Sequence, residues 1–276
     1  MSSVDAENQR QTMPDLQRPR APALFLLAAL LSCSLPALAQ RARLTHAPEP
    51  AKLIRKTQVY QAPAGVALYP GDLVDAGTQG VQIEWPSGVM LALGPGSAVV
   101  VDDALAFPAV TLVHGWLKVA GASNAANARL NVAAGSLSIG AAGAGVIHVA
   151  PGKTELFVEQ GSLQVSAVDR TPAAAPLVLG RDQYALQRAP EGLQTSPRPA
   201  RPFVNEMPRA FFDPLVALAA RTRPAEPAPQ REATPADLAP YADAAAPLRR
   251  QLANRLAPRP PVPPRKPPRA LSNTLF

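Results

Sequence analysis

The residues that could do chemistry are few, and none of them forms a catalytic pattern. His46, His114 and His148 have no Asp, Glu or Cys at the spacing of metal ligands. Such histidines are better explained as exposed or core side chains than as general bases or ligands. We therefore expect no catalytic residue, no metal site and no enzymatic activity.

Two acidic pairs resemble a calcium site at first sight, and a glycine-rich stretch resembles a phosphate-binding loop. Asp72 with Asp75, and Asp102 with Asp103, lie in turns, where carboxylates commonly bond to the nearby main chain, so calcium is not needed to explain them. Residues 140–145, Gly-Ala-Ala-Gly-Ala-Gly, look like a phosphate loop but have neither the Lys-Ser/Thr pair nor a following helix. This stretch is interpreted as a tight corner between strands, and no cofactor is expected.

Trp116 and Lys118 are the candidate contact surface in the body of the chain. Within Gly-Trp-Leu-Lys-Val, residues 115–119, Leu117 and Val119 define the apolar face of a strand, which places Trp116 and Lys118 on the opposite face. A tryptophan exposed beside a lysine indicates a surface that meets a partner. The pattern predicts that this pair faces solvent.

A second set of candidate contacts is cationic and lies near the C-terminus. Leucines at i+4 spacing beside arginines predict an amphipathic helix at 237–256, and the proline-rich residues 258–269 predict an extended polyproline II rod. Helix and rod together carry the residues expected to contact an anionic partner: Arg249, Arg250, Arg255, Arg259, Arg265, Lys266 and Arg269.

A repeated phrase indicates the elements that position these residues. The segments 115–119, 135–139 and 161–165 each begin with glycine and then place apolar side chains two residues apart, the period of a strand with one buried face. Their starts lie 20 and 26 residues apart, which is typical of β coils that bury their apolar faces against one another. We expect an all-β, solenoid-like stack of short strands over residues 62–188.

The flanking segments differ in composition from this β domain. Residues 40–61 are expected to form a basic lead-in arm. Residues 189–276 are expected to form a basic, proline-rich tail that is largely disordered, with short helices near 208–221 and 237–256.

The N-terminus has the features of an export signal. Arg18 and Arg20 precede an apolar run from 21 to 35, and the following Ala-Leu-Ala offers a small-x-small cleavage site before Gln40. The first 39 residues are therefore predicted to be a signal peptide. The expected location is the periplasm, with no membrane span in the mature form.

Cys33 is the only cysteine of the chain and lies inside this leader. If cleavage occurs before Gln40, the mature protein has no cysteine, which excludes disulfides, thiolate zinc sites and a cysteine nucleophile. The alternative is a lipoprotein, because residues 30–33, Leu-Leu-Ser-Cys, loosely match a lipobox that would make Cys33 a lipidated N-terminus.

Charge narrows the choice of partner. Residues 63–194 carry six Lys and Arg against ten Asp and Glu, whereas residues 195–276 carry thirteen against six. The basic excess therefore lies outside the β domain. Behind an export signal, an acidic envelope protein or an anionic envelope polymer is a better expectation than a nucleic acid.

The order of glycine turns resembles that of the FecR domain over residues 62–187. The segments that carry the resemblance are Pro-Gly-Asp-Leu (70–73), Gly-Val-Gln-Ile-Glu-Trp (80–85), Ser-Gly-Val-Met-Leu (87–91), Gly-Pro-Gly-Ser (94–97), the repeated Gly-x-Leu-x-Val phrase, residues 154–165 and Leu-Gly (179–180). The resemblance implies a periplasmic β-rich module with a solenoid-like shape.

Three departures from the family bear on function. About twenty residues precede the apolar leader, too few for the cytoplasmic sigma-binding domain and spanning helix of iron-transport regulators. A proline-rich tail stands where those regulators commonly have a signalling domain, and residues 140–145 replace the family's Arg-Gly-Thr turn. The resemblance thus supports the predicted fold and the periplasmic location more than it supports a role in sigma-factor regulation.

Three functions fit these observations. The first is a non-enzymatic exported scaffold or interaction module of the bacterial envelope. The second is a component of cell-surface signalling that relays to a sigma and anti-sigma system. The third is a module that binds cell wall or polysaccharide.

Overall fold

The computed structural model describes residues 41–102, 107–121, 129–168, 175–188 and 191–241. They form an all-β body followed by a segment with a few short helices, so the predicted fold class is confirmed. None of the helices in these ranges is long and apolar enough to cross a membrane.

Two sheets make up the body. In order of pairing, sheet A contains β1 (Arg43–His46), β5 (Val81–Glu84), β6 (Met90–Leu93), the second half of β8 (Ala109–Ala120), β11 (Ala144–Ala150), β12 (Lys153–Gln160), β15 (Tyr184–Arg188) and β16 (Gly192–Ser196). Sheet B contains β17 (Ala228–Glu232), β3 (Gln58–Ala62), β2 (Ala51–Arg55), β4 (Leu73–Asp75), β7 (Ala98–Asp102), the first half of β8, β9 (Leu130–Ala134), β10 (Leu137–Ala141), β13 (Ser162–Ala167) and β14 (Leu177–Gly180).

The chain winds between the sheets in pairs of strands. After β8, the pair β9 and β10 lies in sheet B, β11 and β12 in sheet A, β13 and β14 in sheet B, and β15 and β16 in sheet A. Neighbouring strands are antiparallel, apart from the parallel pair β8 and β9. The stretch 140–145 is one of the corners, because β10 ends in it and β11 begins in it.

Strand β8 belongs to both sheets because it bends at Gly115. Residues 109–114 pair with β7 and β9, whereas residues 115–120 pair with β6 and β11. Gly115 has a φ of +87°, and a Cβ atom there would lie 2.4 Å from Oγ of Ser97. Only glycine meets both conditions, so this residue permits the crossing between sheets.

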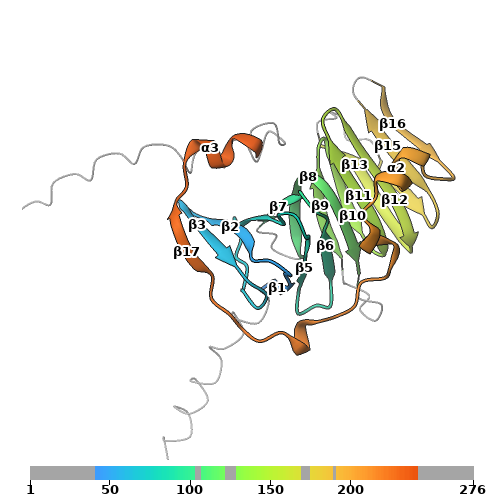
Figure 1. Ribbon diagram of the computed structural model, residues 1–276. Helices are drawn as coiled ribbons and strands as arrows, with labels where there is room; N and C mark the ends of the chain where they lie inside the picture. The colour runs from blue at the N-terminus through green and yellow to red at the C-terminus, as the bar shows by residue number, and fades with distance from the viewer. Residues whose placement is uncertain (1–40, 103–106, 122–128, 169–174, 189–190, 242–276) are drawn as a thin grey trace, which may run out of the picture. The chain divides into compact units, whose positions relative to one another are not determined.

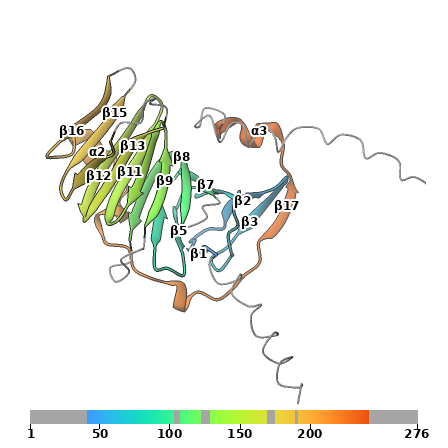
Figure 2. The same cartoon turned by 180° about the vertical axis from the view of Figure 1, so that it is seen from behind.

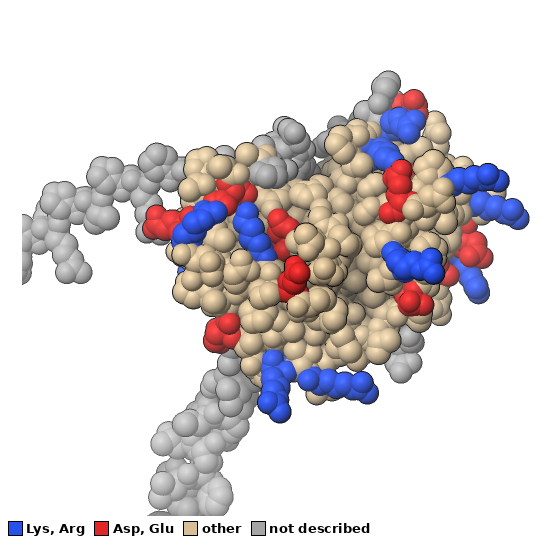
Figure 3. All heavy atoms as spheres, viewed as in Figure 1, with Lys and Arg blue, Asp and Glu red and all other residues tan. Residues whose placement is uncertain are grey.

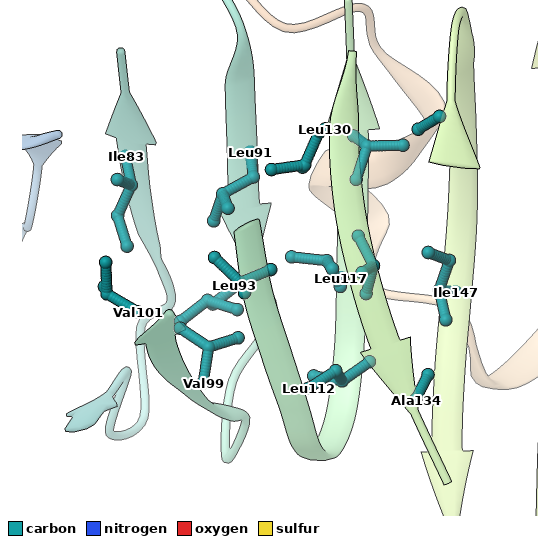
Figure 4. Close-up of a cluster of buried hydrophobic side chains, with 14 of the residues drawn as sticks. Ile83, Leu91, Leu93, Val99, Val101, Leu112, Leu117, Leu130, Ala134 and Ile147 are labelled. Atoms are coloured by element: carbon teal, nitrogen blue, oxygen red, sulfur yellow. The ribbon is translucent and has the colours of Figure 1, made fainter. Parts of the chain in front are cut away.

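The main core lies between the two sheets and follows the two-residue alternation of the strands. Figure 4 shows a part of it, in which side chains from both sheets meet: Ile83, Leu91, Leu93, Leu117 and Ile147 from sheet A, and Val99, Val101, Leu112, Leu130 and Ala134 from sheet B. The repeated glycine phrase contributes Leu117, Leu137 and Leu163 to this core. The alternation therefore predicted the inward faces correctly.

The C-terminal part of the described chain crosses the outside of both sheets. We call residues 197–241 the strap. Its elements are α2 (Arg201–Glu206), the 3₁₀ helices η1 (Arg209–Phe212) and η2 (Ala219–Arg221), β17, α3 (Pro235–Leu238) and the 3₁₀ helix η3 (Ala239–Tyr241). Figures 1 and 2 show it in orange, leaving α2 beside β12 and reaching β17 beside β3.

The strap buries apolar side chains on both outer faces. On sheet A, the cluster consists of Trp116, Val146, Tyr184, Phe203 and Phe211. On sheet B, it consists of Ile54, Val59, Leu73, Ala98, Val100, Val113, Leu238 and Tyr241. Both outer faces thus carry a small core of their own in addition to the main one.

The two flanking segments differ from expectation. Residues 40–61 do not form an arm, because β1, β2 and most of β3 lie there and Leu44 and Leu53 are fully buried in the main core. Strands also continue past residue 188, since β16 pairs with β15. Residues 191–241 are not the disordered tail that their prolines predicted, because the strap packs on the body.

The helix expected near 208–221 is replaced by η1, η2 and an extended link between them. Pro208 and Pro214 cannot donate main-chain hydrogen bonds, which disfavours a continuous α-helix. Side chains of sheet A, described below, instead bond to the main chain of this stretch. Of the helix expected at 237–256, the described part contains α3 and η3, and residues 242–256 lie outside it.

Candidate functional site

Trp116 and Lys118 lie on the outer face of sheet A, as the alternation predicted, but they do not face solvent. Trp116 is 8% exposed and Lys118 is 2% exposed. The reason is the strap, whose α2 and η1 elements pack on this part of the sheet. The prediction of an exposed pair was therefore wrong, and the surface it identified is occupied by the chain's own strap.

Lys118 holds the strap by donating hydrogen bonds to the main chain of the strap. Its Nζ atom donates to the carbonyl oxygens of Phe211 at 2.6 Å and Asp213 at 2.9 Å, and it pairs with the carboxylate of Glu159 at 2.8 Å. An ammonium has three N–H donors, so these three partners use all of them. Without the strap, two of those donors would lose their partners.

Trp116 forms the centre of an aromatic cluster beneath α2. Its ring stacks on that of His148 with the centroids 3.9 Å apart and the planes 8° from parallel. Phe203 of α2 packs against Trp116 at 5.1 Å and against Tyr184 at 5.4 Å. Such aromatic contacts add to the apolar area that each ring buries.

A buried carboxylate lies at the edge of this cluster. The Glu155 carboxylate accepts a hydrogen bond from the Tyr184 hydroxyl at 2.7 Å, pairs with Lys153 at 2.8 Å, and lies 3.0 Å from Nδ1 of His148. Burial alone would raise the pKa of Glu155, but the hydrogen bonds from His148, Lys153 and Tyr184 lower it to about 2. Burial, with the bond to Glu155, also raises the pKa of Tyr184. Both carboxylate oxygens are thus engaged, which is the arrangement of a structural anion.

A second buried carboxylate, Glu84 on β5, holds the next part of the strap. It accepts main-chain N–H bonds from Leu218 at 2.7 Å and Ala219 at 3.1 Å. The side chains of Thr45 and Gln82 also donate to it, each at 2.8 Å. Gln82 donates in addition to the carbonyl oxygen of Val216 at 2.8 Å. Polar side chains of sheet A therefore bond to successive main-chain groups of the strap, in addition to the apolar packing of Phe203 and Phe211.

The end of the strap is fixed on sheet B. Asp237 receives two bonds from Arg231, at 2.6 and 2.7 Å, and one from the main-chain N–H of Thr234 at 2.8 Å. The bonds from Arg231, followed by that from Thr234, hold the pKa of Asp237 far below its usual range. Four residues later, the Tyr241 hydroxyl donates to Asp75 at 2.8 Å.

The other residues singled out in the sequence lie in turns, in packing contacts or on the surface. Asp72 and Asp75 accept main-chain N–H bonds within their turns, as expected, and Asp72 also forms a bidentate pair with Arg55. His46 is exposed, and His114 stacks on Tyr241 with the ring centroids 5.6 Å apart. In the described ranges, no three His, Cys, Asp or Glu side chains gather as metal ligands. Asp103 lies outside those ranges.

The seven basic residues expected to contact an anionic partner all lie beyond residue 241, outside the described part. Conversely, the sequence reasoning missed Glu84 as a residue that holds the strap and Glu155 as a buried structural anion. The alternation of Gln82 and Glu84 with Val81, Ile83 and Trp85 places Glu84 on the outer face, and the structure shows that every residue of this strand, β5, is buried. A charged side chain at an outward position of such a strand indicates that something covers it.

Comparison with known proteins gives limited similarity. No family model and no curated protein matches the chain. Two crystal structures described as "a putative anti-sigma factor from Parabacteroides distasonis", at 1.65 and 2.50 Å resolution, superpose with a TM-score of 0.39 and 11% sequence identity. The match covers 47% of this chain and 61% of each of those chains, less than two thirds of their length. Membership of the FecR family thus stays a prediction from the order of the glycine turns.

Proposed function

We propose that the protein is a non-enzymatic, exported interaction module of the bacterial envelope. In this proposal, the two sheets are a rigid scaffold, the strap is fixed on the scaffold, and the basic residues after the strap bind an anionic partner. On the outer face of sheet A, the strap covers the surface around Trp116 and Lys118.

The observation that carries the proposal is the anchoring of Tyr241. This residue is 2% exposed, bonds to Asp75 and stacks on His114. The chain that follows it, residues 242–276, carries seven Lys and Arg against one Asp. A basic segment that starts from a fixed point on a scaffold loses less conformational freedom on binding than one on a mobile linker.

Charge substitution tests this function. We expect that replacing all seven basic residues after Tyr241 with Gln strongly weakens binding of the exported protein to anionic envelope polymers. Binding of the unchanged protein should weaken as salt rises, because exposed charges are screened over about 8 Å at physiological ionic strength. We expect the melting temperature to stay unchanged.

A matched control keeps the composition of residues 242–276 but scrambles their order. If charge alone carries the contact, this variant still binds; if it fails while keeping its fold, the order of residues is recognised. Undiminished binding by the variant with seven Gln residues would place the contact elsewhere and reject the proposed role of this segment.

A further inference from the structure

The function proposed above does not use a group of four arginines on the folded part of the chain. Arg43 is the first residue of β1 and Arg41 lies two residues before it, whereas Arg221 ends η2 and Arg223 lies two residues after it. Arg41, Arg221 and Arg223 are exposed and Arg43 is half-buried. Within the described part of the chain, none of the four forms an ion pair with a carboxylate.

Main-chain contacts bring these arginines together. The segment 65–68 runs along the free side of β1, with Leu44 N–H bonding to Val66 O at 2.9 Å. The strap lies along the other side of that segment, because Val66 bridges to Ala225. Two strand spacings, about 10 Å, therefore separate β1 from the strap near Arg223. Thr222, between the two strap arginines, also bonds to Thr45 O at 3.0 Å.

The nearby carboxylates form no ion pair with the group. Glu84 lies opposite Arg43 in the pairing of β1 with β5, but its oxygens are already occupied by Thr45, Gln82 and the two strap amides. Glu226 is exposed on the strap and forms no ion pair with these arginines. Figure 3 shows Lys and Arg side chains projecting from the lower edge of the view, below the part of the strap that leads to β17 in Figure 1.

Exposed apolar side chains lie on the strap before Arg221 and beside Arg41. Phe212 is 54% exposed and Val216 is 62% exposed, both on the strap, and Tyr69 is 37% exposed. The guanidinium group of Arg41 lies over the Tyr69 ring, 4.4 Å from its centroid. The described residues expose six large apolar side chains. Two of them, Phe212 and Val216, lie on the strap, and a third, Tyr69, contacts Arg41.

We propose that this surface, formed by Arg41, Arg43, Arg221 and Arg223 with Tyr69, Phe212 and Val216, docks on an anionic lipid surface. Guanidinium groups match phosphate oxygens in shape and charge, and unpaired arginines lose no internal ion pair when they bind. Exposed aromatic and aliphatic side chains beside a basic group favour the interface between headgroups and acyl chains. A soluble polyanion would use the arginines but would gain nothing from Phe212 and Val216.

Vesicle binding of the exported protein tests the proposal. We expect sedimentation with vesicles that contain phosphatidylglycerol and not with vesicles of phosphatidylcholine alone. The variant R221Q/R223Q should bind about 25-fold more weakly, because each basic residue near an anionic membrane contributes roughly a fivefold factor in affinity. The measurement is made on a protein whose seven basic residues after Tyr241 are Gln, so that failure of this surface and failure of the basic segment are distinguishable.

The matched control removes two arginines elsewhere. R181Q/R188Q changes the net charge equally, but both residues are exposed and lie beside carboxylates, in the turn after β14 and at the end of β15. We expect this variant to bind within about twofold of the parent. Equal loss in the two variants would show that only net charge matters and would overturn the proposal.

The apolar part is tested by F212S/V216S. This variant should lose vesicle binding while its binding to soluble polyphosphate stays unchanged. If polyphosphate binds tightly and vesicles do not, the arginine group serves a soluble polyanion and the assignment to lipid is wrong. Urea unfolding checks that each variant keeps the parent's stability, as expected for exposed side chains.

Discussion

Lys118 on β8 donates a hydrogen bond of 2.6 Å to the main-chain oxygen of Phe211, although the two residues are 93 positions apart in the chain. The lysine is almost fully buried, and its other partners are a second strap carbonyl and Glu159. A buried ammonium is costly unless every donor is used. The strap therefore supplies the acceptors that the buried Lys118 needs, and Lys118 in turn holds the strap on sheet A.

The variant Lys118→Met tests this dependence. Methionine keeps most of the volume but removes the donors, so Glu159 and two strap carbonyls lose their partner. We expect a loss of about 2 to 3 kcal/mol in the free energy of unfolding, less than for a fully buried pair because Glu159 is 26% exposed. Trypsin should also cut the strap near Arg209 and Arg221 earlier than in the unchanged protein.

Arg181→Met is the control for this substitution, because Arg181 is 74% exposed. It should change the free energy of unfolding by no more than about 0.5 kcal/mol. If Lys118→Met is as mild as the control and cleavage of the strap is not accelerated, Lys118 does not hold the strap.

Glu84→Gln should loosen the strap at a different point. The amide has one acceptor oxygen in place of two, so the N–H group of Leu218 or of Ala219 loses its partner. We expect destabilisation by about 1 to 2 kcal/mol. Hydrogen exchange should accelerate at these two amides while the β-sheet amides keep their protection.

Glu49→Gln provides the comparison, since Glu49 accepts an exposed bond from Thr78 at 3.1 Å. We expect little change there in stability or exchange. Exchange that accelerates equally throughout the protein in Glu84→Gln would mean general destabilisation rather than release of the strap.

The sequence predicted correctly which side chains of a strand point to the core. It did not predict which outer faces are covered by distant parts of the chain. The alternation around Gly115 assigned Leu117 and Val119 to the core and Trp116 and Lys118 to the outer face, and these faces are correct. Exposure of the outer face could not be predicted in the same way. It depends on a segment more than 80 residues further along the chain, whose proline content is typical of disordered segments.

The helix expected near 208–221 failed for a related physical reason. Phe211, Leu215 and Leu218 lie at helical spacing, and that spacing assumes that the main chain bonds to itself. Here the main-chain groups of the stretch bond to Lys118, Gln82 and Glu84. Side chains from another part of the fold can thus replace the internal bonds of a helix, which a periodicity within one segment does not reveal.

The low pKa of Glu155 predicts acid sensitivity. An unfolded glutamate titrates near 4.5, and folding lowers this pKa to about 2, so the unfolded state binds more protons at pH values between the two. Stability from this group is therefore present above about pH 4.5 and is lost as the pH falls to about 2. The difference corresponds to about 3 kcal/mol.

Urea unfolding at a series of pH values measures this contribution. Glu155→Gln should be less stable than the unchanged protein at pH 7, and its stability should fall less between pH 5 and pH 2.5. Asp182→Asn, at a side chain that is 72% exposed, should leave the profile unchanged. Parallel profiles for Glu155→Gln and the unchanged protein would contradict the assigned pKa.

Gly115→Ala tests whether the bend of β8 needs glycine. The φ of +87° is unfavourable for alanine, and the new methyl group would lie 2.4 Å from Oγ and 2.7 Å from Cα of Ser97. Gly96→Ala is a matched control, because Gly96 also has a positive φ, +64°, but a methyl group there would meet no atom within 4 Å. We expect about 1 kcal/mol of destabilisation for the control and at least about 2 kcal/mol more for Gly115→Ala, measured by urea unfolding. Equal losses in the two variants would mean that the conformation alone, and not the contact with Ser97, requires glycine at the bend.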